Sequence, residues 1–135
     1  MRIVLDTNVL VSGLLSPDGP PGRVLDLLLR GDIVLCFDDR VLAEYRRVLA
    51  RPKFGFEPAR VKEILDYLHG EGEAASAAPL NIELPDPNDC AFLEVAVAAG
   101  AEFLITGNLK HFPGALRRGV NVVGPDEFLE KHWQS

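Results

Sequence analysis

Three acidic residues and one asparagine lie at positions from which they could share a metal ion. Asp6 and Asn108 each come just after a short apolar run, where a buried strand would end. Glu44 and Asp89 lie in the first turns of two predicted helices. Three carboxylates brought together would repel one another and raise one another's pKa unless a cation neutralised them. Mg²⁺ and Mn²⁺ prefer such oxygen ligands, and they serve phosphodiester cleavage by activating water.

Each of these residues also has a structural role open to it. An aspartate such as Asp6, directly before a helix, is often its N-cap. Asp89 could be the third position of a capping-box-like helix start in which Asp86 is the cap. Glu44 could form an exposed ion pair one turn away, and residues 106–108 could be a tight turn. The sequence leaves both sets of roles open.

Histidine and cysteine spacing argues against a zinc site or a disulfide framework. His69, His111 and His132 show no HxxH or HxxxH spacing, and the chain has no CxxC. Cys36 lies inside an apolar run, which predicts a buried thiol in a reducing compartment.

The elements that must position these residues alternate along the chain. Apolar, mostly β-branched runs predict strands, and apolar residues at helical spacing predict helices between them. The predicted strands are 3–5, 33–37, 102–106 and 120–123, and the predicted helices are 9–15, 20–30, 40–50, 58–68, 90–99 and one that starts at 125. The stretch 70–78 is predicted to be a mobile connection, and 81–84 a short edge segment. This alternation predicts a three-layer α/β/α sandwich with a central parallel sheet of four to five strands, as one domain over residues 1–135.

Composition sets limits on the class of protein. The 135 residues include 14 Lys+Arg and 20 Asp+Glu, for a net charge of −6, and 47% of them are hydrophobic. This is typical of a globular chain, excludes bulk disorder and disfavours a sequence-blind nucleic-acid coat. The apolar run near the N-terminus is too short for a signal peptide, and no run approaches the roughly 18 residues of a membrane span. We therefore expect a soluble, cytoplasmic protein with no membrane partner.

Basic residues lie close in sequence to two of the candidate ligands. One group surrounds Glu44 and another, which includes Lys110 and His111, follows Asn108, so both could hold phosphates at the rim of an acidic pocket. The alternative is an ordinary solvated surface. The principal candidates for RNA contact are Arg40, Arg46, Arg47 and Lys110.

Four segments, in order, resemble the PIN domain family. Residues 4–10 resemble its opening motif, a strand that runs into Asp-Thr-Asn, and Glu44 resembles the acid on its middle helix. Residues 89–96 resemble its Asp followed seven positions later by Ala. Residues 103–108 resemble its late strand, which usually ends in Thr-x-Asp or Thr-Gly-Asp. The likeness covers nearly the whole chain.

The resemblance implies an α/β fold and a metal-dependent ribonuclease of the kind found as the toxin of toxin–antitoxin pairs. It implies that Asp6, Glu44 and Asp89 bind Mg²⁺ or Mn²⁺ and orient the attacking water. It further implies an RNA substrate, an antitoxin partner and a homodimer. Supporting hydrogen bonds would come from Thr7, Asn8 and Thr106. For the dimer, the candidate exposed apolar residues are Phe54, Phe56, Tyr67 and Leu68, and packing in the core is the alternative for each of them.

Asn108 departs from the usual acid of this motif. It can offer a carbonyl oxygen but removes one negative charge, so a second metal should bind more weakly. Asp86 is a substitute acid three residues before Asp89. The departure keeps open a catalytically weak PIN-like module that binds RNA or protein.

A phosphoaspartate protein, of receiver or phosphatase type, is a further alternative. Asp38 and Lys110 loosely match a receiver, but the acid pair after its first strand is absent. The phosphatase pattern Asp-x-Asp is broken by Asn8.

Overall fold

Five short parallel strands form the centre of the molecule in a computed structural model, which describes residues 1–133. Their order across the sheet is β3-β2-β1-β4-β5, and every neighbouring pair is parallel. This confirms the predicted α/β class and parallel sheet. The last two residues of the predicted 1–135 domain, Gln134 and Ser135, lie outside the described residues. The strands are β1 (Arg2–Leu5), β2 (Val34–Phe37), β3 (Glu73–Ala74), β4 (Phe103–Ile105) and β5 (Val122–Val123).

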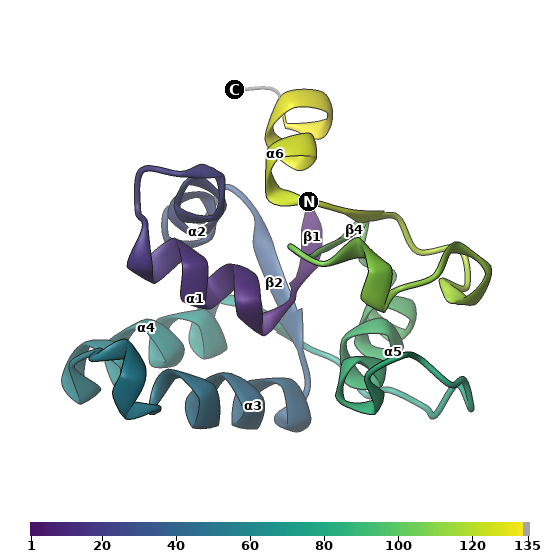
Figure 1. Cartoon of the computed structure of the whole chain (residues 1–135), viewed down its shortest axis with the longest axis horizontal. Coiled ribbons are helices and arrows are strands. Elements are labelled where there is room, and N and C mark those ends of the chain that lie inside the picture. The colour runs from purple at the N-terminus through teal and green to yellow at the C-terminus, as the bar shows by residue number, and fades with distance from the viewer. Residues whose placement is uncertain (134–135) are drawn as a thin grey trace.

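Helices cover both faces of the sheet, which gives the three layers predicted from the sequence. Four helices, α1 to α4, lie on one side of the sheet, and α5 packs on the other (Figure 1). The helices are α1 (Thr7–Leu15), α2 (Pro20–Leu29), α3 (Asp39–Leu49), α4 (Pro58–Glu71), α5 (Cys90–Ala99) and α6 (Pro125–Glu127), which continues into a π-helical turn over Phe128–His132. Short 3₁₀ turns are η1 (Pro52–Phe54), η2 (Pro87–Asp89), η3 (Leu109–His111) and η4 (Gly114–Leu116).

Local sequence explains where several of these helices begin and end. Proline, whose φ suits the first helical position and which lacks an N–H, begins α2, α4 and α6. The carboxylate of Asp38 caps α3 by accepting from the Val41 amide at 3.0 Å. Gly100, at φ 61°, ends α5 in the left-handed conformation that glycine adopts without strain.

The core fixes the two elements that carry the first candidate ligands. Ile3, Val4 and Leu5 of β1 are at most 1% exposed. The buried hydroxyl of Tyr45 on α3 donates to the carbonyl oxygen of Leu5 at 2.5 Å. On the same side, α1 and α2 approach so closely that a Cβ on Gly13 would lie 2.9 Å from the Pro21 carbonyl oxygen. The end of β1 is therefore held rigidly against α3.

Two local predictions from the sequence are wrong. The stretch 70–78 is not a mobile connection throughout, because α4 extends to Glu71 and β3 then pairs with β2 at the edge of the sheet. Residues 81–84 form no strand, although Leu84 is buried. A two-residue strand contains too few side chains to show an alternating pattern, so periodicity could not separate these cases.

The predicted apolar face for a dimer is also wrong in part. Leu68 is only 2% exposed and belongs to the core, whereas Tyr67 is 37% exposed. Phe54 and Phe56 are half-buried and stack on one another, with ring centroids 5.7 Å apart. Leu68 follows the apolar stripe of α4 with Ile64 and Leu65 into the interior.

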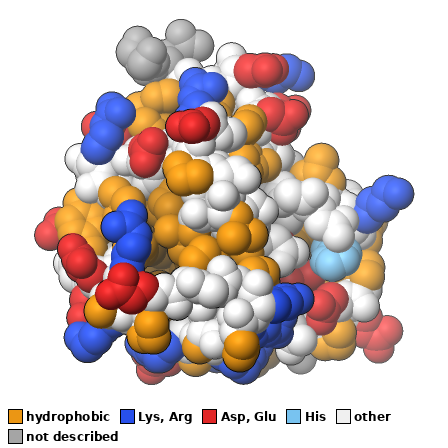
Figure 2. Space-filling view, turned by 60° about the vertical axis from the view of Figure 1, so that its left-hand side comes forward, with side chains coloured by type: hydrophobic (Ala, Val, Ile, Leu, Met, Phe, Trp, Pro, Cys, Tyr) orange, Lys and Arg blue, Asp and Glu red, His pale blue; other side chains and the backbone are white. Residues whose placement is uncertain are grey.

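Figure 2 shows the surface on the side of α1, α2 and α4, where hydrophobic side chains gather in the middle of the face among acidic and basic ones. A hollow of about 130 Å³ between these helices is lined by Leu14, Leu25, Phe56 and Val61, among others. Across residues 1–133, no helix combines the length and the apolar character that crossing a membrane requires.

Candidate metal centre

Asp6 and Thr106 meet at the carboxyl edge of the sheet, because β1 and β4 are neighbours with Leu5 paired to Ile105. In open α/β sheets this edge is where ligands collect. The Thr106 hydroxyl donates to Asp6 Oδ2 at 2.7 Å, and the two residues are 0% and 3% exposed. Asp6 occupies the N-cap position of α1, but its side chain makes no capping hydrogen bond. The carboxylate of Asp6 is thus directed to the site.

Asp89 ends the turn η2, immediately before α5, and is 6% exposed. Asp86 caps this turn by accepting from the Asn88 amide at 3.0 Å, which confirms the capping role predicted for Asp86. Asp89 itself caps nothing. Its Oδ2 lies 3.0 Å from His111 Nδ1, but the angle is not that of a hydrogen bond, and Oδ2 has no hydrogen-bond partner within residues 1–133.

Both buried carboxylates have a raised pKa, and Asp6 contributes to the shift of Asp89. Burial raises the pKa of Asp6, and the hydrogen bond from Thr106 partly offsets this effect. Burial also raises the pKa of Asp89 to about 6, the charges of Asp6 and Asp86 raise it further, and His111 lowers it. Two acids that are costly to ionise together, one with an unpartnered oxygen, form a donor set that fits a divalent cation.

Glu44 on α3 lies beside Thr7, the residue after Asp6, but within residues 1–133 neither Glu44 nor Asp6 belongs to a group of three ligand atoms that lie within 4.8 Å of one another. Glu44 accepts a hydrogen bond from the hydroxyl of Thr7, the first residue of α1, and Arg47 approaches its other oxygen at 3.6 Å. The neighbouring residue Asn8 is exposed. Of the two supporting residues predicted after Asp6, Thr7 therefore contacts an acidic side chain of the site.

Asn108 connects the two halves of the site through a histidine. The Asn108 amide N–H donates to Thr106 Oγ1 at 3.0 Å, and its side-chain Nδ2 lies 2.9 Å from His111 Nε2. His111 Nδ1 then faces Asp89. Sequence reasoning grouped His111 with the basic residues that follow Asn108, because no spacing rule connects a histidine on η3 to an aspartate on η2.

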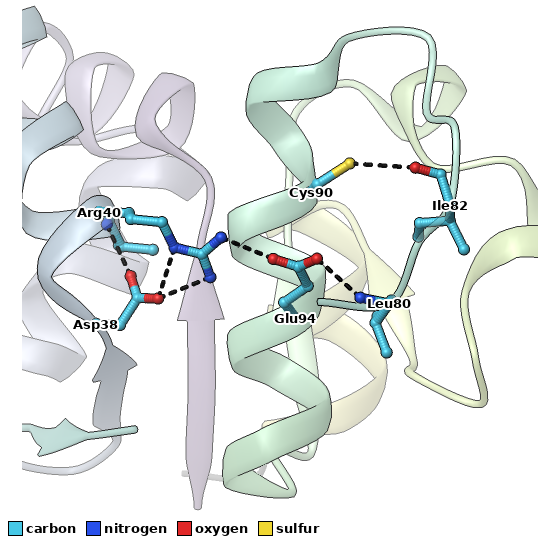
Figure 3. A network of polar contacts seen from close by, with 7 residues as sticks. Asp38, Arg40, Leu80, Ile82, Cys90 and Glu94 are labelled. Carbon is cyan, nitrogen blue, oxygen red and sulfur yellow. Dashed lines mark hydrogen bonds and ion pairs between the residues drawn. The ribbon is translucent and has the colours of Figure 1, made fainter. Parts of the chain in front are cut away.

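A polar brace, which we define as Asp38, Arg40, Leu80 and Glu94, holds together the elements that carry Glu44 and Asp89. Arg40 at the start of α3 reaches Glu94 Oε1 on α5 at 2.7 Å, and Asp38 Oδ2 at 2.8 Å (Figure 3). The other oxygen of Glu94 accepts from the Leu80 amide at 3.0 Å. These carboxylates raise the pKa of Arg40, the hydrogen bond to Glu94 being the largest effect. Glu94 thus links α5 to α3 and to the segment that contains Leu80, and the sequence analysis did not predict these contacts.

The basic candidates lie on different surfaces. Arg40 and Arg47 line a groove of about 340 Å³ together with Glu44 and Asn88. Arg46 instead lines a separate, more apolar hollow between α3 and α4. Lys110 is exposed on η3, beside His111.

The chain is similar to known proteins in its sequence and in its fold. The PIN domain family matches residues 2–110. An uncharacterized protein of Methanocaldococcus jannaschii is 30% identical over 111 residues, which cover 80% of this chain and 71% of that protein.

Two solved structures share the fold. One is a chain of VapBC2 from Rickettsia felis bound to a DNA fragment from their promoter, with a TM-score of 0.61 and 17% identity over 92% of this chain and 98% of that one. The other is a chain of FitAB bound to the IR36 DNA fragment, with a TM-score of 0.62 and 22% identity over 91% of this chain and 94% of that one.

Proposed function

The chain belongs to the PIN domain family, and we propose that it is a Mg²⁺- or Mn²⁺-dependent ribonuclease that hydrolyses RNA phosphodiester bonds. One observation carries the proposal. Asp6 and Asp89 are both buried at the carboxyl edge of the sheet, the charge of Asp6 raises the pKa of Asp89, and one oxygen of Asp89 has no hydrogen-bond partner within residues 1–133. Such a pair destabilises the metal-free fold, so its presence is best explained by a bound cation.

Asp6, Glu44 and Asp89 are the proposed catalytic metal ligands. A bound divalent cation supplies a Lewis acid and lowers the pKa of a coordinated water. The chain's own residues orient these carboxylates: Thr106 holds one oxygen of Asp6, and the Thr7 hydroxyl holds Glu44. Asn108 adds no charge, and its side chain is engaged with His111. Its role toward metal is therefore proposed to be indirect.

The groove beside Glu44 is the proposed path for RNA. Arg47 is 62% exposed and lies at its rim, where a guanidinium can meet a phosphate. Arg40 also lines the groove, but two carboxylates already hold its guanidinium. Lys110, on the exposed side of η3, is a further candidate for phosphate contact.

The matched pair Arg46→Ala and Arg47→Ala tests this path, because the two residues are adjacent on one helix but face different hollows. Binding of a catalytically inactive background to single-stranded RNA is measured against salt concentration. We expect Arg47→Ala to weaken binding and to reduce the salt dependence by about one phosphate contact, and Arg46→Ala to do neither. Equal losses in both variants would contradict the proposed path.

Cleavage of a mixed RNA pool with Mg²⁺ or Mn²⁺ tests the nuclease itself. We expect Asp6→Asn and Asp89→Asn to lose activity by about 10³-fold or more, as is usual when a group of the catalytic machinery is removed. The matched control is Asp32→Asn, which makes the same change at an exposed residue paired with Arg30. Variants that cleave as well as wild type would refute the carboxylate site. A wild type that binds RNA but cleaves none would favour a binding module.

We further propose that the protein is the toxin of a toxin–antitoxin pair. The support is that both structural neighbours come from two-component assemblies named VapBC2 and FitAB, each bound to DNA. Co-purification with the product of the adjacent gene tests the partner, and light scattering of each form tests the homodimer. Growth arrest on expression, relieved by that product and absent for Asp6→Asn, is the expected outcome.

A further inference from the structure

Three side chains from two separate turns converge beside Asp89. Asp86 and Asp89 come from η2, and His111 comes from η3. One ligand atom of each lies within 4.8 Å of the other two. Asp86 caps its turn through Oδ1, which leaves its other oxygen outside that bond. Asp89 is 6% exposed, and its Oδ2, which has no hydrogen-bond partner in the part of the chain that the structure describes, faces His111 Nδ1.

We propose that His111 binds a divalent metal through Nδ1, together with Asp89 and Asp86, and that this nitrogen makes the centre select Mn²⁺ over Mg²⁺. The inference deepens the proposed function by naming the ion, and it rests on that function only in assuming that the same centre serves the reaction.

The geometry suits a shared ion. Two ligand atoms at right angles on an octahedral ion with bonds of about 2.1 Å are about 3.0 Å apart. The distance between His111 Nδ1 and Asp89 Oδ2 is 3.0 Å. Because this approach lacks hydrogen-bond alignment, no bond between the two must be broken for an ion to enter. The His111 side chain is 34% exposed, which leaves a route from solvent.

Asn108 supplies what the other ring nitrogen needs. Metal binding at Nδ1 requires the imidazole proton on Nε2, where an acceptor must hold it. The Asn108 side-chain amide lies 2.9 Å from Nε2 and can present either its N–H or, after a half-turn, its carbonyl oxygen. The Asn108 side chain can therefore donate to Nε2 when no metal is bound and accept from Nε2–H when metal is bound. A carboxylate at position 108 could serve only the second state, which gives a physical reason for asparagine there.

The nitrogen ligand determines the selectivity. Imidazole suits the transition metals, whereas Mg²⁺ prefers an all-oxygen shell. A site formed from Asp6, Glu44 and Asp89 alone would be of the oxygen type. Adding His111 shifts the preference toward Mn²⁺, while Asp86 and Asp89 still supply the oxygen ligands that a hard ion needs.

Mn²⁺ is the probe for the test, and the readout is spectroscopic rather than catalytic. We expect the electron spin-echo envelope of Mn²⁺ bound to wild type to show the modulation of a directly coordinated imidazole nitrogen. We expect His111→Ala to abolish this modulation and to weaken Mn²⁺ binding about tenfold, with little change in Mg²⁺ binding. The control is His69→Ala, an exposed histidine on α4, which should leave both unchanged.

A second variant keeps the test decisive if the alanine variant folds poorly. His111→Asp replaces the nitrogen by oxygen, so we expect it to lose the modulation while shifting the preference toward Mg²⁺. Bound Mn²⁺ without nitrogen modulation in wild type, or a Mn²⁺-to-Mg²⁺ preference that is unchanged in both His111 variants, would overturn the inference.

The outcomes separate this inference from the proposed function. RNA cleavage supported equally by Mg²⁺ and Mn²⁺, with no nitrogen modulation, overturns the inference and leaves the ribonuclease standing. Nitrogen modulation without any RNA cleavage supports the inference and argues against the ribonuclease. Absence of Mn²⁺ binding overturns the inference, and absence of both Mn²⁺ and Mg²⁺ binding overturns the proposed function as well.

Discussion

Asp89 and Glu94 are two buried carboxylates on neighbouring turns, and their surroundings differ completely. Glu94, 8% exposed, uses one oxygen for Arg40 and the other for the Leu80 amide. Asp89, 6% exposed, lies near two other acids and has an oxygen without a hydrogen-bond partner among residues 1–133. A buried carboxylate with partners holds elements together, whereas one without them is held ready for a ligand. Because both acids are buried, burial alone does not tell a structural carboxylate from a candidate ligand. The presence or absence of hydrogen-bond partners does.

Removing the partnered carboxylate should cause the largest loss of stability. Glu94→Ala leaves the Leu80 amide unpaired and separates α3 from α5, so we expect the free energy of unfolding to fall by about 3 kcal/mol. Urea unfolding measures it. Glu63→Ala, at an exposed position of α4, is the control and should change it by less than about 0.5 kcal/mol. A small effect of Glu94→Ala would show that the brace does not stabilise the fold.

Adding metal should stabilise the protein through the candidate metal centre and not through the brace. With Mn²⁺ at 100 times its dissociation constant, we expect wild type to gain about 2.7 kcal/mol by mass action, read as a rise in Tm. Asp6→Asn and Asp89→Asn should lose this rise, while Glu94→Ala, although less stable, should retain it. Loss of the rise in Glu94→Ala would show that the two regions are not independent.

Without metal, the unpartnered carboxylate should destabilise the fold as pH rises. The pKa of Asp89 is raised to about 6 in the folded protein, against about 3.9 for an unperturbed aspartate. The unfolded chain therefore loses this proton first, and stability falls between about pH 4 and pH 6 and then levels off. In EDTA at pH 7.5 we expect Asp89→Asn to be more stable than wild type by about 2 kcal/mol, with no gain at pH 4. If wild type and Asp89→Asn were equally stable at both pH values, the raised pKa of Asp89 would be refuted.

The outer end of the brace should give the smallest effect. Asp38 caps α3 through the Val41 amide and pairs with Arg40, so we expect Asp38→Ala to cost about 1 kcal/mol. The adjacent Asp39→Ala is the control and should cost less than about 0.5 kcal/mol, since Asp39 is no cap. Thermal unfolding of both variants checks this, and equal losses would assign the effect to helix charge rather than to the cap.

Much of the scaffold of the site is predictable from the residues. Asp6 follows the buried run 3–5, and Thr106 follows the buried run 103–105. Because parallel strands end at the same edge of a sheet, Asp6 and Thr106 must lie close together once β1 and β4 are neighbours. Helical spacing also contains a signal that the sequence analysis did not use. Residues 40, 44 and 47 share one face of α3, and position 46 does not, which matches the different hollows of Arg46 and Arg47.

The contacts that complete the site were not predictable in this way. His111 reaches Asp89 because of the path of η3, and the Leu80 amide reaches Glu94 because of the irregular segment 75–86, and neither segment contains a periodic pattern. Arg40 and Glu94 lie on two predicted helices, but no local pattern shows that these helices contact one another. The two-residue strand β3 and the burial of Leu84 escaped prediction for the same reason.

The sequence by itself therefore determined the α/β class, the order along the chain of every strand but β3, and the strand end or helix start at which Asp6, Glu44 and Asp89 lie, because hydrophobic periodicity and strand ends are local properties. Only the tertiary structure decided which acids have partners. That depends on side chains brought together from distant turns, and it is what separates Glu94, which holds α3 to α5, from Asp89, which lies in the candidate metal centre.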